Sequence, residues 1–210
     1  MIKIIDFIND RLSSLTFIDE WFGFVEKRPT DKAGELPVYY DADKEVLMPV
    51  RFQVPGMGYI RQKGTAEFSI VENPYSLRRQ YEVSVPMAAV VKVQAARLGG
   101  MDVRHRTELA LAVVQALTFD GKEMGSNNPG NLSMIRVQAT EHDVLGSKVL
   151  NEEFSRPGKK DFSPEDIVIS VGFRISFRVY VDCFEDLCKG DGALFRVLQE
   201  SEHFILLEDG

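Results

Sequence analysis

One long alternating segment constrains the fold of this chain more than any other feature of its 210 residues. In "IVISVGFRISFRVYVDCF", residues 167–184, every odd-numbered position from Ile167 to Cys183 is apolar. The positions between them are mostly polar, and the side chains of an extended chain point alternately to opposite faces. The segment is therefore predicted to be an antiparallel strand with one buried side and one solvent-facing side.

The length of this strand sets a second constraint. From Ile167 to Cys183 there are sixteen steps, and at a rise of about 3.4 Å each they would span about 54 Å. A compact chain of this size has a diameter of only about 43 Å. The strand is therefore expected to protrude, to bend or to break in two, and Gly172 is the position that favours a bend or bulge.

The order of the other predicted elements indicates the fold class. Helical spacing of apolar residues predicts a first helix at 2–15 and a second at 104–118. Strands are predicted at 36–41, 45–54, 66–72, 80–94 and 132–140, with a strand or packed loop at 17–25, a turn at 55–59 and an interruption at Pro86. Strands outnumber helices and alternate in character, which predicts one α+β domain, residues 1–210, with a largely antiparallel sheet and helices on one face.

Two further segments extend this pattern. Residues 143–166 are weakly patterned and include the polar stretches "RPGKKD" and "SPED". Compact domains rarely contain connections this long, so the segment is predicted to be an extended arm or a loop that orders against a neighbour. After the long strand, a short carboxy-terminal helix is predicted, capped by Asp191 and with Leu194, Val197 and Leu198 on one side.

Hydropathy and cysteine usage indicate the cellular environment in which the chain is expected to fold. No run approaches the roughly 18 to 20 apolar residues that span a bilayer, and the amino terminus, with Asp6 and Asp10 inside its apolar pattern, does not read as a signal peptide. We therefore expect no membrane association. Cys183 and Cys188 have no second pair to complete a four-ligand metal site, so free thiols in a reducing compartment are expected.

The charge is unevenly distributed. The formal net charge of -7 argues against a general nucleic-acid binder. Residues 60–106 carry eight bases and four acids, a net of +4, whereas residues 185–210 carry seven acids and two bases, a net of -5. These are either solvated faces or patches of opposite sign that steer head-to-tail association of identical subunits.

The sequence contains no catalytic, cofactor or metal signature. The three histidines, His105, His142 and His203, are scattered, and "DADKE" at 41–45 lacks the glycine and glutamate that a calcium loop requires at its later positions. The dense charged cluster at 102–108 opens the second helix. An exposed helix start or an inter-subunit contact is favoured there over an active site, so the chain is not expected to be an enzyme.

Charged residues supply the candidate subunit contacts. Arg174 and Arg178 lie four apart on the polar face of the long strand, where they either protect a sheet edge from aggregation or form inter-subunit salt bridges. The candidate interface residues taken together are Arg104, Arg106, Arg174, Arg178, Lys159, Lys160, Glu185 and Asp186.

In order along most of its length, the chain resembles neck and tail-completion proteins of tailed bacteriophages, of the tail-terminator type. The resemblance is carried by the helix "IKIIDFINDRLSSL", the edge "LPVYYD", the strand "YEVSVPM", the helix "RTELALAVVQAL" and the late strand "ISFRVYVDCF". Each is a pattern and none is a fixed motif, and the arm at 143–166 has no place in a minimal member.

This resemblance implies a structural virion protein, assembled in the cytoplasm of the host bacterium. It implies a homo-oligomeric ring around the DNA channel at the neck or tail, in contact with other neck or tail proteins, through which DNA passes without specific binding. Two alternatives remain open. A tail-tube or baseplate-like protein would have a closed β-sandwich core, and an uncharacterised small-molecule enzyme would need a pocket near 102–108.

Overall fold

The computed structural model describes residues 2–29, 35–41, 44–71, 80–94, 103–128, 132–145 and 166–180. Its helices are α1 (Ile2–Ser13), α2 (Val103–Ala116) and the short 3-10 helix η2 (Gly125–Asn127). Its strands are β1 (Glu20–Pro29), β2 (Glu35–Asp41), β3 (Val46–Pro49), β4 (Gly56–Gln62), β5 (Glu67–Val71), β6 (Gln80–Gln94), β7 (Phe119–Asp120), β8 (Leu132–Leu145) and β9 (Asp166–Tyr180). Within these ranges, no helix is long and apolar enough to cross a membrane.

The strands form one mixed sheet in the order β3-β2-β1-β4-β6-β9-β8-β7, with β5 pairing to the other end of β6. All pairs are antiparallel except β1 with β4. The central pair is β6 and β9, which are matched from Gln80 opposite Tyr180 to Gln94 opposite Asp166. A mostly antiparallel sheet with helices confirms the predicted α+β class.

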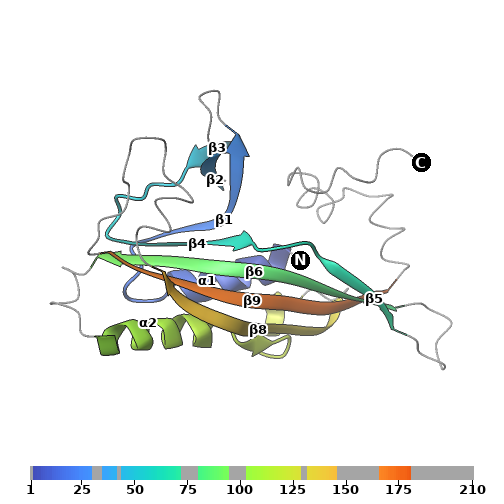
Figure 1. Ribbon diagram of the computed structural model, residues 1–210. Coiled ribbons are helices and arrows are strands. Elements are labelled where there is room, and N and C mark those ends of the chain that lie inside the picture. The colour runs from blue at the N-terminus through green and yellow to red at the C-terminus, as the bar shows by residue number, and fades with distance from the viewer. Residues whose placement is uncertain are drawn as a thin grey trace.

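Helices α1 and α2 cover the same face of the sheet, because both contribute to one core; in Figure 1, α2 lies below the strands and α1 passes behind them. The main core fills the space between them and the sheet, because α1 contributes Ile4, Ile8 and Leu12 at helical spacing and α2 contributes Leu109 and Val113. The odd-numbered residues of β9 from Ile167 to Val179 are all buried in this core. The alternation predicted for the long strand is therefore confirmed.

A second, smaller core lies on the opposite face. Strands β1, β2 and β3 rise above the sheet at one end (Figure 1), and the segment that follows β3 folds back with them. The buried members of this core are Phe22, Val25, Val50, Phe52, Met57, Tyr59, Val90 and Val168. Val168 is thus buried although it lies on the mainly polar side of β9.

Gly172 marks an irregularity, but in the neighbouring strand. The register of β8 against β9 shifts between Ala139 and Glu141, which lie opposite Phe173 and Gly172. A Cβ atom on Gly172 would come within 2.7 Å of Glu141 Cγ, so the glycine leaves room for that side chain. Strand β9 itself does not break, since its pairing with β6 is continuous over 15 residues.

Two predictions for the middle of the chain are wrong. Residues 55–59 are not a turn, because β4 begins at Gly56 and is buried at its start. Pro86 does not interrupt β6. Its carbonyl oxygen accepts a hydrogen bond from Lys63 N at 3.0 Å. The N–H and C=O of a strand residue point to the same side, so the N–H that Pro86 lacks would point toward the edge of β6 that pairs with β5 and β4. Pro86 lies between the residues that pair with β5 and those that pair with β4, so neither pairing needs this N–H.

The boundaries of the predicted arm also change. Residues 143–145 continue β8, where Leu145 lies opposite Val168, and Asp166 opens β9. The rest of the predicted arm, residues 146–165, lies outside the described residues. The predicted carboxy-terminal helix also lies outside them.

Candidate subunit-contact surfaces

The charged cluster that opens α2 is exposed wherever its side chains are described. Arg106 and Glu108 lie on the surface. Arg104 belongs to the first turn of the helix, and the side chains at 102–105 lie outside the described residues. Within the described part of the chain no group of three or more His, Cys, Asp or Glu is arranged to hold a metal ion. An exposed helix start remains the favoured interpretation of this cluster.

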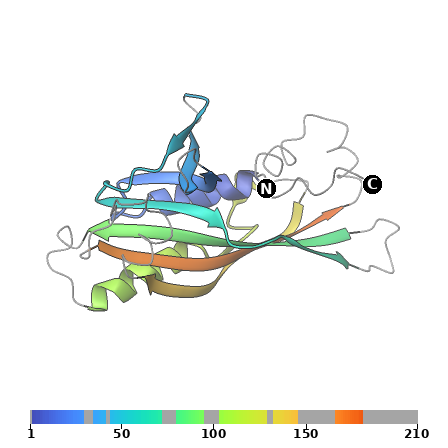
Figure 2. The same cartoon turned by 45° about the horizontal axis from the view of Figure 1, so that its top comes forward.

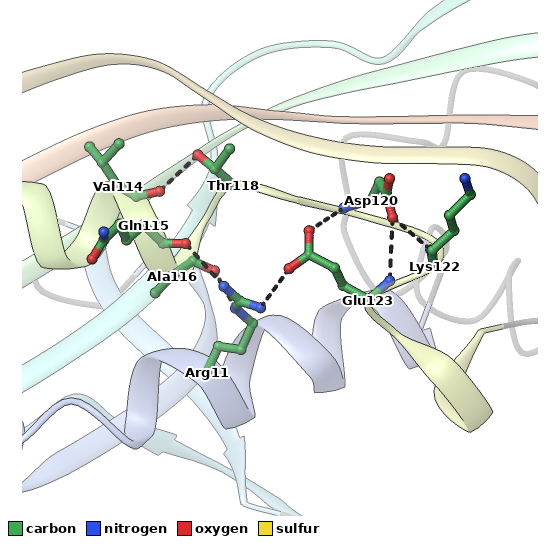
Figure 3. Close-up of polar contacts among 8 residues, drawn as sticks. All are labelled: Arg11, Val114, Gln115, Ala116, Thr118, Asp120, Lys122 and Glu123. Atoms are coloured by element: carbon green, nitrogen blue, oxygen red, sulfur yellow. Dashed lines mark hydrogen bonds and ion pairs between the residues drawn. The ribbon is translucent and has the colours of Figure 1, made fainter.

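Arg11 joins α1 to the end of α2 (Figure 3). Its Nε donates a hydrogen bond to the carbonyl oxygen of Ala116 at 2.9 Å, and a second guanidinium nitrogen donates to that of Gln115 at 3.0 Å. The last carbonyls of a helix lack intrahelical partners, and a cation there opposes the negative end of the helix dipole. Arg11 therefore caps α2 from a neighbouring helix.

The same guanidinium packs on aromatic rings. Its central carbon lies 5.8 Å from the ring centroid of Phe7 and 5.2 Å from that of Phe119, and these two rings meet edge to face at 4.9 Å. A third contact places it 3.5 Å from the carboxylate of Glu123, which also accepts a hydrogen bond from Asp120 N (Figure 3). These contacts connect α1, the end of α2 and the turn that follows β7, so the cluster is a structural joint between them.

Lys92 is a charged residue in the smaller core. Its side chain is 2% exposed and lies 3.9 Å from the carboxylate of Asp166, which is 4% exposed. Its Nζ also donates a hydrogen bond to the carbonyl oxygen of Phe52. Burial lowers the pKa of Lys92, and the charge of Asp166 acts in the opposite direction. The hydrogen bond to Phe52 ties the segment after β3 to the sheet.

Arg174 and Arg178 have partners within the chain. Arg174 donates to Glu67 at 2.8 Å and to Ser84 at 3.1 Å. Arg178 donates to Glu82 at 3.1 Å. Strand β9 lies between β6 and β8, so the interpretation that these arginines protect a sheet edge is wrong. An additional role between subunits stays a prediction. The other candidates, Lys159, Lys160, Glu185 and Asp186, lie outside the described residues.

Strands β2 and β3 present an exposed apolar surface. Tyr40 and Leu47 lie directly opposite each other, so their side chains share one face, and they are 59% and 49% exposed. We name these two residues the β2–β3 surface. The outer edge of β3 has no partner strand among the described residues. An exposed apolar pair beside an open sheet edge is a feature of contact sites between chains.

A second exposed surface lies on α2. Glu108, Leu111 and Gln115 are exposed and follow one another at helical spacing, so they share the side of α2 that faces away from the core. Leu111 is 55% exposed. We name these residues the α2 surface. In Figure 1, α2 lies below the sheet, whereas β2 and β3 lie above it, so the two surfaces belong to opposite sides of the molecule.

Sequence reasoning missed the Arg11 joint, the Lys92 pair and the β2–β3 surface. The Lys92 pair had one clue in the sequence, because a lysine within the apolar run "MAAVVKV" indicates a buried charge. Arg11 gave no such clue, because the carbonyls that it caps lie more than 100 positions away in sequence. Comparison with protein-family models finds no match, and comparison with curated proteins finds none either.

Proposed function

We propose that this chain is a structural subunit of a tailed bacteriophage that assembles into a homo-oligomeric ring at the neck or tail, as a tail terminator or head-tail joining protein. The observation that carries the proposal is the pair of exposed surfaces on opposite sides of one sheet. The β2–β3 surface places Tyr40 and Leu47 in solvent, and the α2 surface places Leu111 there.

Two different surfaces on opposite sides favour a ring over a symmetric dimer. A dimer with twofold symmetry uses the same patch on both partners, whereas a head-to-tail contact joins two different patches and closes into a ring when the rotation allows. In the proposed ring, the β2–β3 surface of one subunit packs against the α2 surface of the next. Burial of Tyr40, Leu47 and Leu111 supplies the apolar centre of this contact.

The net charge fits passage of DNA through the ring. A formal charge of -7 supports a channel along which DNA moves without specific binding. The proposed partners are other copies of this chain and the adjoining neck or tail proteins, in a virion assembled in the host cytoplasm. No membrane and no cofactor enter this proposal.

The architecture favours this proposal over the two alternatives. A tail-tube or baseplate-like protein is expected to have a closed β-sandwich, whereas the main core here lies between one sheet and two helices. A small-molecule enzyme is expected to have a pocket near residues 102–108, where Arg106 and Glu108 are exposed on α2. The sheet and this helix surface therefore give more support to a subunit contact than to catalysis.

Electron microscopy of the purified protein tests the proposal. Closed rings with a central opening are expected for the unmodified chain, and Leu47→Lys is expected to abolish them because it places a charge in the apolar centre of the contact. Met134→Lys is the matched control, since Met134 is also an exposed apolar residue, on β8, and lies in neither surface. Rings that persist in Leu47→Lys would contradict the proposal. Separate, unassembled chains in place of rings in the unmodified protein would also contradict it.

A further inference from the structure

Strand β5 carries two exposed apolar residues on the face of the sheet that forms the main core. Phe68 lies opposite Val83 and Ile70 lies opposite Tyr81 on β6. Directly opposed residues of an antiparallel pair point to the same face. Val83 is a buried member of the main core, yet Phe68 is 54% exposed and Ile70 is 59% exposed. We name these two residues the β5 strip.

The β5 strip is therefore a part of the core face that the described helices do not cover. Figure 2 shows β5 and the beginning of β6 extending beyond α1 and α2. The opposite face of β5 is polar, because Glu67 forms an ion pair there with Arg174 of β9. The apolar side chains of this strand thus face a side where a covering layer is missing from the described residues.

Strand β9 ends beside this strip. Tyr180 lies opposite Gln80, and Gln80 lies opposite Val71, so the three residues form one row across β9, β6 and β5. Neighbouring strands are about 4.8 Å apart, so Tyr180 and Val71 are separated by about 10 Å. Ile70 is the next residue along β5. The chain after Tyr180 therefore starts within a short distance of the uncovered strip.

The sequence after Tyr180 has the composition that such a strip would bind. Residues 181–210 include the predicted amphipathic helix with Leu194, Val197 and Leu198 on one side. Residues 181–190 can span up to about 33 Å, which is ample to bring that helix over β5. The segment 185–210 has a net charge of -5, and the bases Arg78 and Arg79 immediately precede Gln80 in sequence. The apolar side of the predicted helix, the length of the linker and the opposite charges of the two segments therefore all favour docking on the β5 strip.

We propose that the β5 strip is the docking site of this chain's own carboxy-terminal segment, with Leu194, Val197 and Leu198 packed on Phe68 and Ile70. The tether makes the same chain the favoured occupant over a second copy, since a short linker gives an effective concentration of the order of millimolar. This inference goes beyond the ring and does not depend on it, because the ring contact uses the β2–β3 and α2 surfaces.

The test measures how fast a thiol at the strip reacts. In a full-length background in which Cys183 and Cys188 are replaced by serine, Ile70→Cys introduces a single thiol, and its rate of alkylation by a maleimide is measured. Adding Leu194→Asp and Leu198→Asp is expected to speed the reaction by about tenfold, which corresponds to about 1.4 kcal/mol of docking free energy. Ser126→Cys in the same background is the matched control, because Ser126 is exposed on η2 and lies in neither ring surface, and its rate is expected to stay unchanged.

Phe68→Cys repeats the measurement at the second strip residue, so that a defect confined to one variant does not decide the outcome. Protection that is independent of protein concentration supports docking within the chain. A thiol at the strip that reacts as fast as the control thiol at position 126 would overturn the inference, and so would protection that disappears on dilution, since a second copy would then be the occupant. Because the ring is scored separately by microscopy, its failure and the failure of this inference are distinguishable.

Discussion

Lys92 on β6 and Asp166 on β9 form a buried ion pair across the central strand pair of the sheet, with Nζ 3.9 Å from the carboxylate oxygen. Lys92 also donates to the carbonyl of Phe52, so three segments distant in sequence meet at one ammonium group. Loss of one partner of a buried pair removes attraction that offsets the desolvation of the other charge, which costs more than loss of an exposed pair.

We therefore expect Lys92→Met to lower the free energy of unfolding by about 3 kcal/mol. The double variant Lys92→Met with Asp166→Leu is expected to recover most of this loss, because it leaves no buried charge. Urea denaturation followed by circular dichroism measures both changes. A single variant as stable as the unmodified protein would contradict the burial of this pair.

The lowered pKa of Lys92 also predicts how stability changes with pH. In the unfolded chain this group titrates near its ordinary pKa of 10.5. Between the lowered pKa of the folded state and this value, the unfolded chain binds more protons, so the contribution of Lys92 to stability increases as pH rises. Urea denaturation across the alkaline range is expected to show this positive contribution as the difference between the unmodified protein and the double variant. A contribution of the opposite sign would mean that the charge of Asp166 raises the pKa of Lys92 by more than burial lowers it.

Arg11→Met tests the joint between the helices. The change removes two hydrogen bonds to the carbonyls of Gln115 and Ala116 together with the cation at the end of α2. Because Arg11 is partly exposed, we expect a loss of about 1 to 2 kcal/mol in the free energy of unfolding. Glu123→Gln removes only the more exposed ion pair and is expected to change it by less than about 0.5 kcal/mol. Equal effects of the two substitutions would contradict the capping role.

Gly58→Ala tests the packing at the start of β4. A Cβ atom there would lie 3.2 Å from the carbonyl oxygen of Val90 and closer still to the indole of Trp21, whose Nε1 donates to Asn9. We expect a loss of about 1 to 3 kcal/mol from overpacking. Gly64→Ala is the control, since its nearest contact would be 3.4 Å from Pro86 Cγ and its expected change is within about 0.5 kcal/mol. Thermal denaturation compares the two variants.

Arg174→Glu combined with Arg178→Glu separates the two roles of these arginines. Their partners Glu67 and Glu82 are 64% and 44% exposed, so a role confined to the chain predicts a loss of stability of only about 1 kcal/mol and an unchanged mass of the assembly. The reciprocal changes Glu67→Arg and Glu82→Arg, made together with them, are expected to restore stability. Loss of assembly in the first variant that the reciprocal changes do not reverse would assign the arginines to a contact between subunits.

The elements that could be predicted from sequence are those whose pattern is local and long. Strand β9 alternates over its whole length, and α2 repeats its apolar residues at helical spacing, so periodicity was sufficient for both. Strand β4 was predicted as a turn because proline and glycine are common in turns. In the structure, Trp21 packs over position 58 and leaves no room for a side chain there. The glycine is therefore required by tertiary packing and not by a turn.

The contact surfaces were harder to predict for a related reason. Tyr40 and Leu47 belong to short strands whose exposure depends on how β2 and β3 rise from the sheet, and no local pattern encodes that arrangement. Arg174 and Arg178 were recognised as neighbours on one face, but their partners Glu67 and Glu82 come from β5 and β6. Charge patterns in one strand therefore located the face and could not identify its partners.

The mass of the purified protein in solution, measured by light scattering at low and moderate salt, tests the central claim most directly. The ring predicts one discrete species whose mass is an integer multiple, at least threefold, of the 23.7 kDa chain. Leu47→Lys is expected to reduce this species to single chains. A mass of one chain at both salt concentrations and at every protein concentration would contradict self-assembly into a ring.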